Sequence, residues 1–136
     1  MTTILEQEIA VYTVKYDAVD KVIRVNVQGP TYLQDLLNCI TEIAHLAKQE
    51  DCFVVLTDLR KADLQLSVLE TYQFPERISA IARSESLSIY KFKRAIVVSQ
   101  DHSILGFYET VCRNRHHNVM LFHEVETALC WLCANR

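Results

Sequence analysis

Three short apolar runs, each followed by a segment with helical periodicity, constrain the fold of this 136-residue chain more than any other feature. They cover residues 53–56, 95–98 and 119–122 and contain no polar side chain. The absence of polar alternation is typical of strands that helices cover on both faces. Repeated strand and helix units of this kind predict an α/β fold with three roughly parallel, buried strands.

Period-two alternation ahead of these units predicts a β-hairpin. Along residues 11–16 and again along 23–28, every second side chain would belong to the same face of a strand, and one of the two faces would be solvated. The two segments lie on either side of the turn at 17–21. A helix should follow, because Thr31 and Gln34 have capping-box spacing and an apolar stripe continues to Ala47. We therefore predict one domain over residues 1–136, with 1–9 disordered. Its expected architecture is a mixed, mostly parallel sheet with an N-terminal β-hairpin and flanking helices.

Later helices can also be placed from their end signals. Ser67 and Glu70 repeat the capping-box spacing and predict a helix start. Pro75 lacks an amide hydrogen and clashes with the preceding turn, so we expect a break there and a fresh turn from 76 to about 82. Residues 83–90 are weakly patterned and are expected to form a loop. Asp101 or Ser103 should cap the next helix, and residues 125–132 should form the last one.

Composition argues against several functional classes. A net charge of −3 provides no basic field for nucleic acid. Two glycines, Gly29 and Gly106, cannot build the glycine-rich loop that cradles nucleotide phosphates, and no cofactor is implied. The chain has neither a basic, apolar leader nor the run of about 18 apolar residues that spans a bilayer. We expect a cytoplasmic protein without a transmembrane segment.

The cysteines and histidines do not form a recognisable reactive site. The five cysteines are an odd number and are expected to be reduced core residues. Cys130 and Cys133 form a lone Cys-x-x-Cys in the predicted last turn of a helix, where the dipole raises a thiol pKa. Zinc would need two further ligands at a recognisable spacing. We predict helix packing for this pair, a solvated turn for His116 and His117, no metal site and no enzymatic activity.

Polar residues follow two of the predicted strands and begin one predicted helix. The carboxyl ends of parallel strands meet at one edge of an α/β sheet, where ligands and partners bind. We predict a polar rim there that binds a partner or acts as a phospho-switch. The alternative is that these residues only cap helices and form turns. The candidate residues are Thr57, Asp58, Arg60, Ser67, Ser99, Asp101 and Ser103.

The stretch 54–60, with Ser67 nine residues beyond Asp58, resembles the SpoIIAA-like or STAS family, which includes bacterial anti-sigma-factor antagonists. The likeness extends from about Val11 through residues 107–115 and 128–132. It implies a SpoIIAA-like fold and a non-enzymatic regulatory module with a protein partner. In the regulatory members the serine matching Ser67 is phosphorylated by a partner kinase. The chain departs from that motif at residue 66, which is leucine instead of aspartate, and at 68–69, where bulky residues that can shield the hydroxyl replace small ones.

Other SpoIIAA-like members resemble carriers of small apolar ligands or membrane-associating domains. Apolar side chains around the weakly patterned stretch provide the corresponding candidate site. If they share the surface, they form a patch that a ligand or a second copy in a homodimer would cover; if they lie inside, they are only core. The residues are Ile78, Ile81, Leu87, Ile89, Tyr90 and Phe92.

Overall fold

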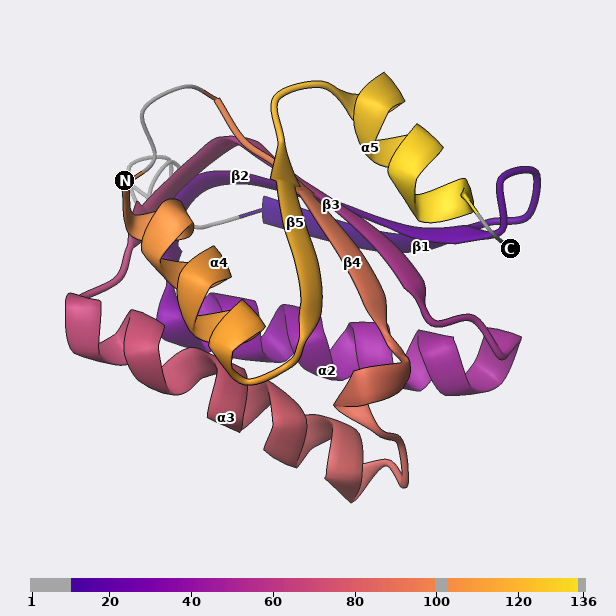
Figure 1. Cartoon of the computed structure of the whole chain (residues 1–136), viewed down its shortest axis with the longest axis horizontal. Helices are drawn as coiled ribbons and strands as arrows, with labels where there is room; N and C mark the ends of the chain where they lie inside the picture. Colours follow the sequence, from indigo (N-terminus) through magenta and orange to yellow (C-terminus); the bar gives the residue numbers. More distant parts are fainter. Residues whose placement is uncertain (1–10, 100–102, 135–136) are drawn as a thin grey trace, which may run out of the picture.

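The computed structural model describes residues 11–99 and 103–134, which form a five-stranded sheet with helices on both faces (Figure 1). In chain order the elements are β1 Val11–Asp17, β2 Val22–Tyr32, α2 Leu33–Glu50, β3 Val54–Gln65, α3 Val68–Ser84, the 3-10 turn η1 Ile89–Lys91, β4 Lys93–Val97, α4 Ser103–Asn114, β5 Asn118–Phe122 and α5 Val125–Cys133.

The strands lie in sequence order across the sheet. β1 is antiparallel to β2, and the pairs β2–β3, β3–β4 and β4–β5 are parallel. Right-handed crossovers that always step in one direction place their helices on one face, here α2, α3 and α4. α5 packs on the opposite face, against β3, β4 and β5 (Figure 1). The predicted α/β fold, with its hairpin and mostly parallel sheet, is confirmed.

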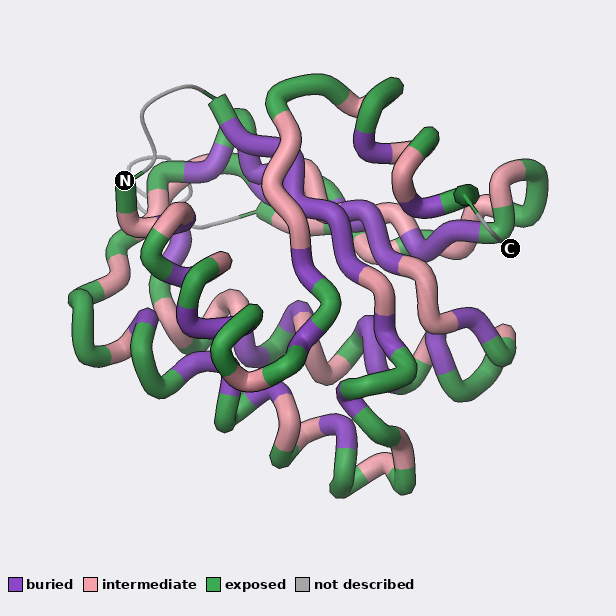
Figure 2. Tube along the Cα trace, in the orientation of Figure 1, coloured by how far each residue is buried: buried purple, intermediate pink, exposed green. Residues whose placement is uncertain are grey.

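The central strands are buried between the two helical layers (Figure 2). In β4 and the residue after it, Ile96 and Val98 belong to the core under α2, α3 and α4, whereas Ala95 and Val97 pack under α5. Both faces of this strand are therefore removed from water. This two-sided covering explains why the apolar run shows no polar alternation.

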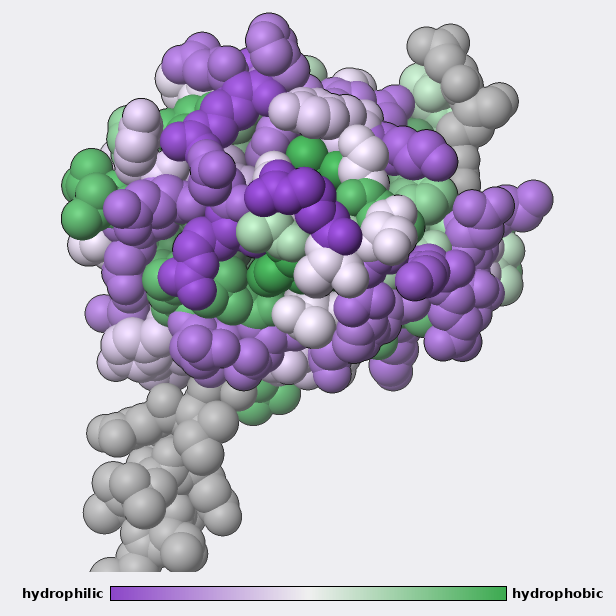
Figure 3. Space-filling model, turned by 90° about the horizontal axis from the view of Figure 1, so that it is seen from below, coloured by the Kyte–Doolittle hydropathy of each residue, from purple (hydrophilic) through white to green (hydrophobic). Residues whose placement is uncertain are grey.

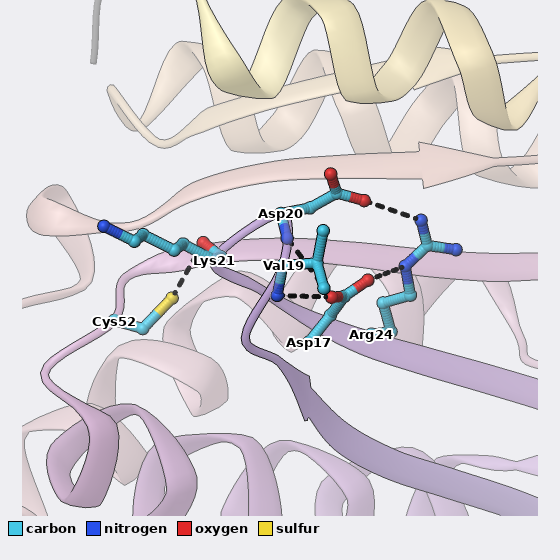
Figure 4. A network of polar contacts seen from close by, with 6 residues as sticks. All are labelled: Asp17, Val19, Asp20, Lys21, Arg24 and Cys52. Carbon is cyan, nitrogen blue, oxygen red and sulfur yellow. Dashed lines mark hydrogen bonds and ion pairs between the residues drawn. The ribbon is translucent and has the colours of Figure 1, made fainter.

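The turn between β1 and β2 is held by a compact polar network (Figure 4). Asp17 Oδ1 accepts hydrogen bonds from the N–H groups of Val19 at 2.9 Å and Asp20 at 3.2 Å. Arg24 Nε lies 3.2 Å from Asp17 Oδ2. The N–H of Asp20 and, to a smaller extent, the other contacts lower the pKa of Asp17. This network fixes the register of the predicted hairpin.

Two predicted helix features are wrong. Thr31 does not begin α2: it is a fully buried residue of β2, and Tyr32 precedes the helix, donating its N–H to Asp35 Oδ2 at 2.8 Å. α3 does not break at Pro75, which is buried beside Phe74. An interior proline costs roughly 3 kcal/mol, and the burial of this segment in the core compensates for it. The expected loop over 83–90 is correspondingly shorter, because α3 continues to Ser84 and η1 begins at Ile89.

Candidate functional site

The length of β3 decides where the predicted rim residues lie. β3 does not end after residue 56 as expected but continues to Gln65, paired with β2 as far as Tyr32. Its pairing with β4 ends earlier, where Asp58 lies opposite Val97. The carboxyl edge of the sheet is therefore stepped, with β2 and β3 extending well beyond β4. The polar residues after the apolar run belong to a strand with one solvated face and not to a turn.

Asp58 and Arg60 form a two-pronged ion pair on this extension. Arg60 Nε donates to Asp58 Oδ1 at 3.0 Å, and Arg60 Nη2 donates to Asp58 Oδ2 at 2.7 Å. The register of β2 shifts beside them, between Asn26 and Gln28, which lets β3 carry one extra residue. The hydrogen bonds from Arg60 lower the pKa of Asp58. The pair thus stabilises a β-bulge and keeps its own donors and acceptors largely occupied.

The structure does not assemble the predicted rim at one place. Gln65 lies seven residue steps along the strand from Asp58, a distance of roughly 23 Å, and Ser67 lies beyond it. Ser99 is exposed just after β4, near the level of Asp58, and Ser103 is the exposed first residue of α4. Asp101 lies outside the described residues. The candidates therefore do not share one site: Asp58, Arg60 and Ser99 lie near the end of β4, Ser103 begins α4, and Ser67 lies at the start of α3.

Ser67 caps α3 as predicted. Its Oγ accepts a hydrogen bond from the N–H of Glu70 at 3.0 Å, and Glu70 Oε1 accepts one from the N–H of Ser67 at 2.9 Å. The residue is exposed, and the neighbouring Val68 and Leu69 are 65% and 63% exposed. The bulky flank therefore does not bury the serine. It surrounds an accessible hydroxyl with apolar surface.

Two exposed tyrosines extend this apolar surface. Tyr72 follows one helical turn after Val68, and Tyr32 pairs with Gln65 at the end of β3. A small apolar area, flanked by hydrophilic side chains, is visible at the left edge of Figure 3, at the end of the molecule where α3 begins. Isolated exposed apolar residues are ordinary, but a group of them on one surface is typical of an interaction site. We call this surface the Ser67 patch, defined by Tyr32, Ser67, Val68, Leu69 and Tyr72.

The capping role of Ser67 can be separated from any signalling role. Ser67→Ala removes the acceptor for the Glu70 N–H and should lower the free energy of unfolding by about 1 kcal/mol. Ser67→Asp retains a capping oxygen and should lose less. Urea denaturation of both variants measures the difference. An equal decrease in the free energy of unfolding of the two variants would contradict a capping role for the Ser67 side chain.

A buried polar cluster around Arg94 was not predicted from the sequence. Arg94 points from β4 into the core under α4; its Nη1 donates to the Tyr108 hydroxyl at 2.9 Å, and its Nη2 lies 3.4 Å from His117 Nδ1 and 4.0 Å from Cys112 Sγ. A guanidinium only donates, so His117 Nδ1 accepts and the neutral ring carries its proton on Nε2, 3.3 Å from Ser79 Oγ. The signal in the sequence is a charged residue, Arg94, at an inward position next to the apolar run 95–98.

Among residues 11–99 and 103–134, all groups found to contact the Arg94 guanidinium are neutral. Burial and the neighbouring positive charge lower the pKa of His117 to about 4. Burial raises the pKa of Tyr108 and of Cys112. The expectation of a solvated turn is therefore wrong for His117, which is only 5% exposed, although His116 is exposed.

The other candidate residues are mostly structural. Three cysteines are buried free thiols, but Cys130 and Cys133 are exposed, so the expectation that all five belong to the core is wrong for this pair. α5 buries Ala128 and Leu132 instead, and the two thiols project from its other side. Across residues 11–99 and 103–134, no three His, Cys, Asp or Glu residues are placed to hold a metal ion.

The predicted apolar site does not form a shared surface patch. Ile78, Ile89 and Phe92 are buried, and Ile81 and Leu87 are half-buried against the same core. Tyr90 alone among the six is exposed, and it contacts the edge of the His117 ring. These side chains are therefore chiefly core.

Comparison with solved structures shows a SpoIIAA-like, STAS-type fold, as the resemblance implied. An anti-sigma factor antagonist from Mycobacterium paratuberculosis superposes with a TM-score of 0.57 and 13% identity over 92% of this chain and 95% of that protein. An uncharacterised DUF3478 protein with a SpoIIAA-like fold from Shewanella loihica has a TM-score of 0.54 and 19% identity over 91% and 93% of the respective chains. No protein-family model and no curated protein sequence matches. None of the helices in the described part of the chain is long and apolar enough to cross a membrane.

Proposed function

We propose that this protein is a non-enzymatic regulatory module that binds a protein partner through the Ser67 patch. The observation that carries the proposal is an accessible serine, at the start of α3, surrounded by exposed apolar side chains. Apolar and aromatic residues supply most of the binding energy when a partner buries them. The fold shared with an anti-sigma factor antagonist supports a protein as the partner.

Ser67 is the proposed switch within this surface. Phosphorylation would add nearly two negative charges among Val68, Leu69 and Tyr72. The N-terminus of α3 favours a phosphate, whereas the carboxylate of Glu70, which now accepts from the Ser67 N–H, repels it. The modification would therefore oppose the capping box and place charge on an apolar docking surface. Both effects change the affinity for a partner.

We infer that the module works in the cytoplasm, which agrees with three buried free thiols. The sequence also suggested that an apolar ligand or a second copy of the chain covers the apolar residues between 78 and 92. Most of these side chains lie in the core, so they form no surface patch for a ligand or a homodimer.

Site-specific photo-cross-linking tests the docking surface. A benzoylphenylalanine at Leu69 should cross-link one protein in the source organism, because this side chain belongs to the Ser67 patch and is 63% exposed. The matched control places the same residue at Val19, which is 91% exposed in the β1–β2 turn. It should cross-link no partner protein. Leu69→Asp should then weaken the purified complex at least about tenfold, and Val19→Asp should leave it unchanged.

Equal cross-linking from the two positions would contradict docking at the patch, and a product with the mass of two copies would identify a homodimer instead. The intact mass of the chain isolated from the same cells, compared with Ser67→Ala, tests the switch separately. A chain that remains unphosphorylated while the cross-link forms would eliminate the switch and retain the docking surface.

A further inference from the structure

Two cysteines lie one helical turn apart on the solvent side of α5. Cys130 and Cys133 are exposed and are not joined in a disulfide. The helix buries Ala128 and Leu132 against the sheet, and both thiols project from the opposite side. Residues three positions apart on a helix are neighbours, with Cβ atoms about 5–6 Å apart. The two sulfur atoms therefore share one surface that small reactants can reach from water.

The other three cysteines are protected from such reactants. Cys39, Cys52 and Cys112 are buried. Burial raises the pKa of the Cys39 thiol to about 12 and also raises the pKa of Cys112. Thiol–disulfide exchange proceeds through the thiolate, so a buried thiol with a raised pKa is inert. All five cysteines lie in the described part of the chain, and only Cys130 and Cys133 combine exposure with a second thiol one turn away.

The end of α5 can accommodate a bond between these two sulfur atoms. Helical geometry places Cα atoms three residues apart at about 5 Å, within the range of about 4.4–6.8 Å that a disulfide requires. The Cβ atoms must approach by roughly 1–2 Å, so the turn has to tighten. Cys133 is the last helical residue, and Ala134 is extended, with φ −67° and ψ 136°. The turn can therefore tighten without disturbing a further turn of helix.

Lys93 offsets the partial charge at this end of the helix. Its Nζ donates to the carbonyl oxygens of Trp131 at 2.5 Å and of Ala134 at 3.4 Å. The last carbonyls of a helix carry a partial negative charge, which disfavours a nearby thiolate. Because an ammonium group lies on these carbonyls, the helix end is less unfavourable to a thiolate than the dipole alone would make it.

We propose that Cys130 and Cys133 are a redox pair that low-molecular-weight disulfides, such as oxidised glutathione, convert to a disulfide within the last turn of α5. One cysteine thiolate attacks a sulfur of oxidised glutathione, whose S–S bond breaks and releases one glutathione thiolate. The second cysteine thiolate attacks the resulting mixed disulfide, which forms the Cys130–Cys133 bond and releases the second glutathione. The chain loses two electrons and two protons, and glutathione gains them as two thiols.

The strain of the tightened turn makes this oxidation reversible. A disulfide whose geometry departs from its preferred values is more easily reduced, and such bonds are the labile ones that respond to a glutathione pool. This agrees with the proposed cytoplasmic location, where disulfides are transient. The pair is independent of the proposed switch at Ser67, because α5 packs on the opposite face of the sheet from α3 (Figure 1).

The intact mass of the folded, full chain after incubation with excess oxidised glutathione tests this pair. We expect the chain to lose two hydrogens within about a few hours. Alkylation in denaturant should then label only the three buried cysteines. After the oxidant is removed, excess reduced glutathione should restore the original mass.

Three variants locate the bond. Cys130→Ser and Cys133→Ser each remove one partner at an exposed position, so both variants should remain folded by circular dichroism and stop at a mixed disulfide with one glutathione. Cys52→Ala retains the pair and should lose two hydrogens as the unmodified chain does.

An unchanged mass, a stable glutathione adduct on the unmodified chain, or a covalent dimer would overturn the proposal. Loss of two hydrogens in Cys130→Ser or Cys133→Ser would also overturn it, because the disulfide would then involve other cysteines. An unchanged mass in a folded Cys52→Ala variant would do the same.

Discussion

Replacing Leu132 with alanine should lower the free energy of unfolding by about 3 kcal/mol. Leu132 is 0% exposed and attaches α5 to the sheet together with Ala128, against Leu56 and Val97. Truncation removes apolar burial and leaves a cavity in the smaller of the two cores, which has few side chains able to fill it. Urea denaturation followed by circular dichroism measures the loss.

Leu129→Ala is the matched control for this prediction, since Leu129 lies on the same helix but is half-buried. This variant should lower the free energy of unfolding by about 1 kcal/mol. Lys93 also attaches α5: its Nζ donates to the Trp131 carbonyl at 2.5 Å and lies 4.7 Å from the centre of the Trp131 ring. Similar losses for the two leucine variants would show that α5 does not depend on its buried face.

Acidification from about pH 8 to about pH 5 should cost about 2 kcal/mol of stability through His117 alone. Its pKa is about 4 in the folded chain and returns to its ordinary value of 6.5 on unfolding. As the pH falls through 6.5 the unfolded chain gains a proton that the folded chain does not, so stability present at neutral pH is lost toward pH 4. Arg94 and Ser79 contact the ring, Tyr90 packs on it, and the charge of Arg115 adds to the shift.

The pH dependence of His117→Asn isolates this contribution. Asparagine retains an oxygen that can accept from Arg94 Nη2 but does not titrate. The free energy of unfolding of this variant should fall by about 2 kcal/mol less than that of the unmodified chain over the same pH range. Acidic groups such as Asp58 are common to both proteins and cancel in the comparison. Parallel pH profiles would show that His117 is not held neutral.

Most of the fold could be predicted because local periodicity reports which faces are covered. The alternation in β1 and β2 and the continuous apolar runs of β4 and β5 each corresponded to an observed strand. The capping box of Ser67 and Glu70 was also confirmed, since both hydrogen bonds lie within one helical turn. Pro75 was misjudged because its cost is local while the packing that compensates for it is not.

The candidate site was less predictable, because it depends on where a neighbouring strand ends. Asp58 was expected in a turn, but continued pairing with β2 keeps this part of β3 extended as far as Gln65. Leu59 and Leu64, which face inward on either side of the bulge, were the available signal for that continuation. Whether Val68 and Leu69 would shield Ser67 or lie open beside it also depended on packing at the start of α3.

The order of strands and helices along the chain and the cap at Ser67 were set by the sequence alone, since each depends on residues a few positions apart. The separation of Asp58 from Ser67 and the burial of Arg94 beside His117 were decided only by the tertiary structure. Those features depend on contacts between β2 and β3 and between β4 and α4, whose residues are distant in the chain. Side-chain burial and the pKa shifts that follow from it are properties of such contacts and have no local sequence pattern.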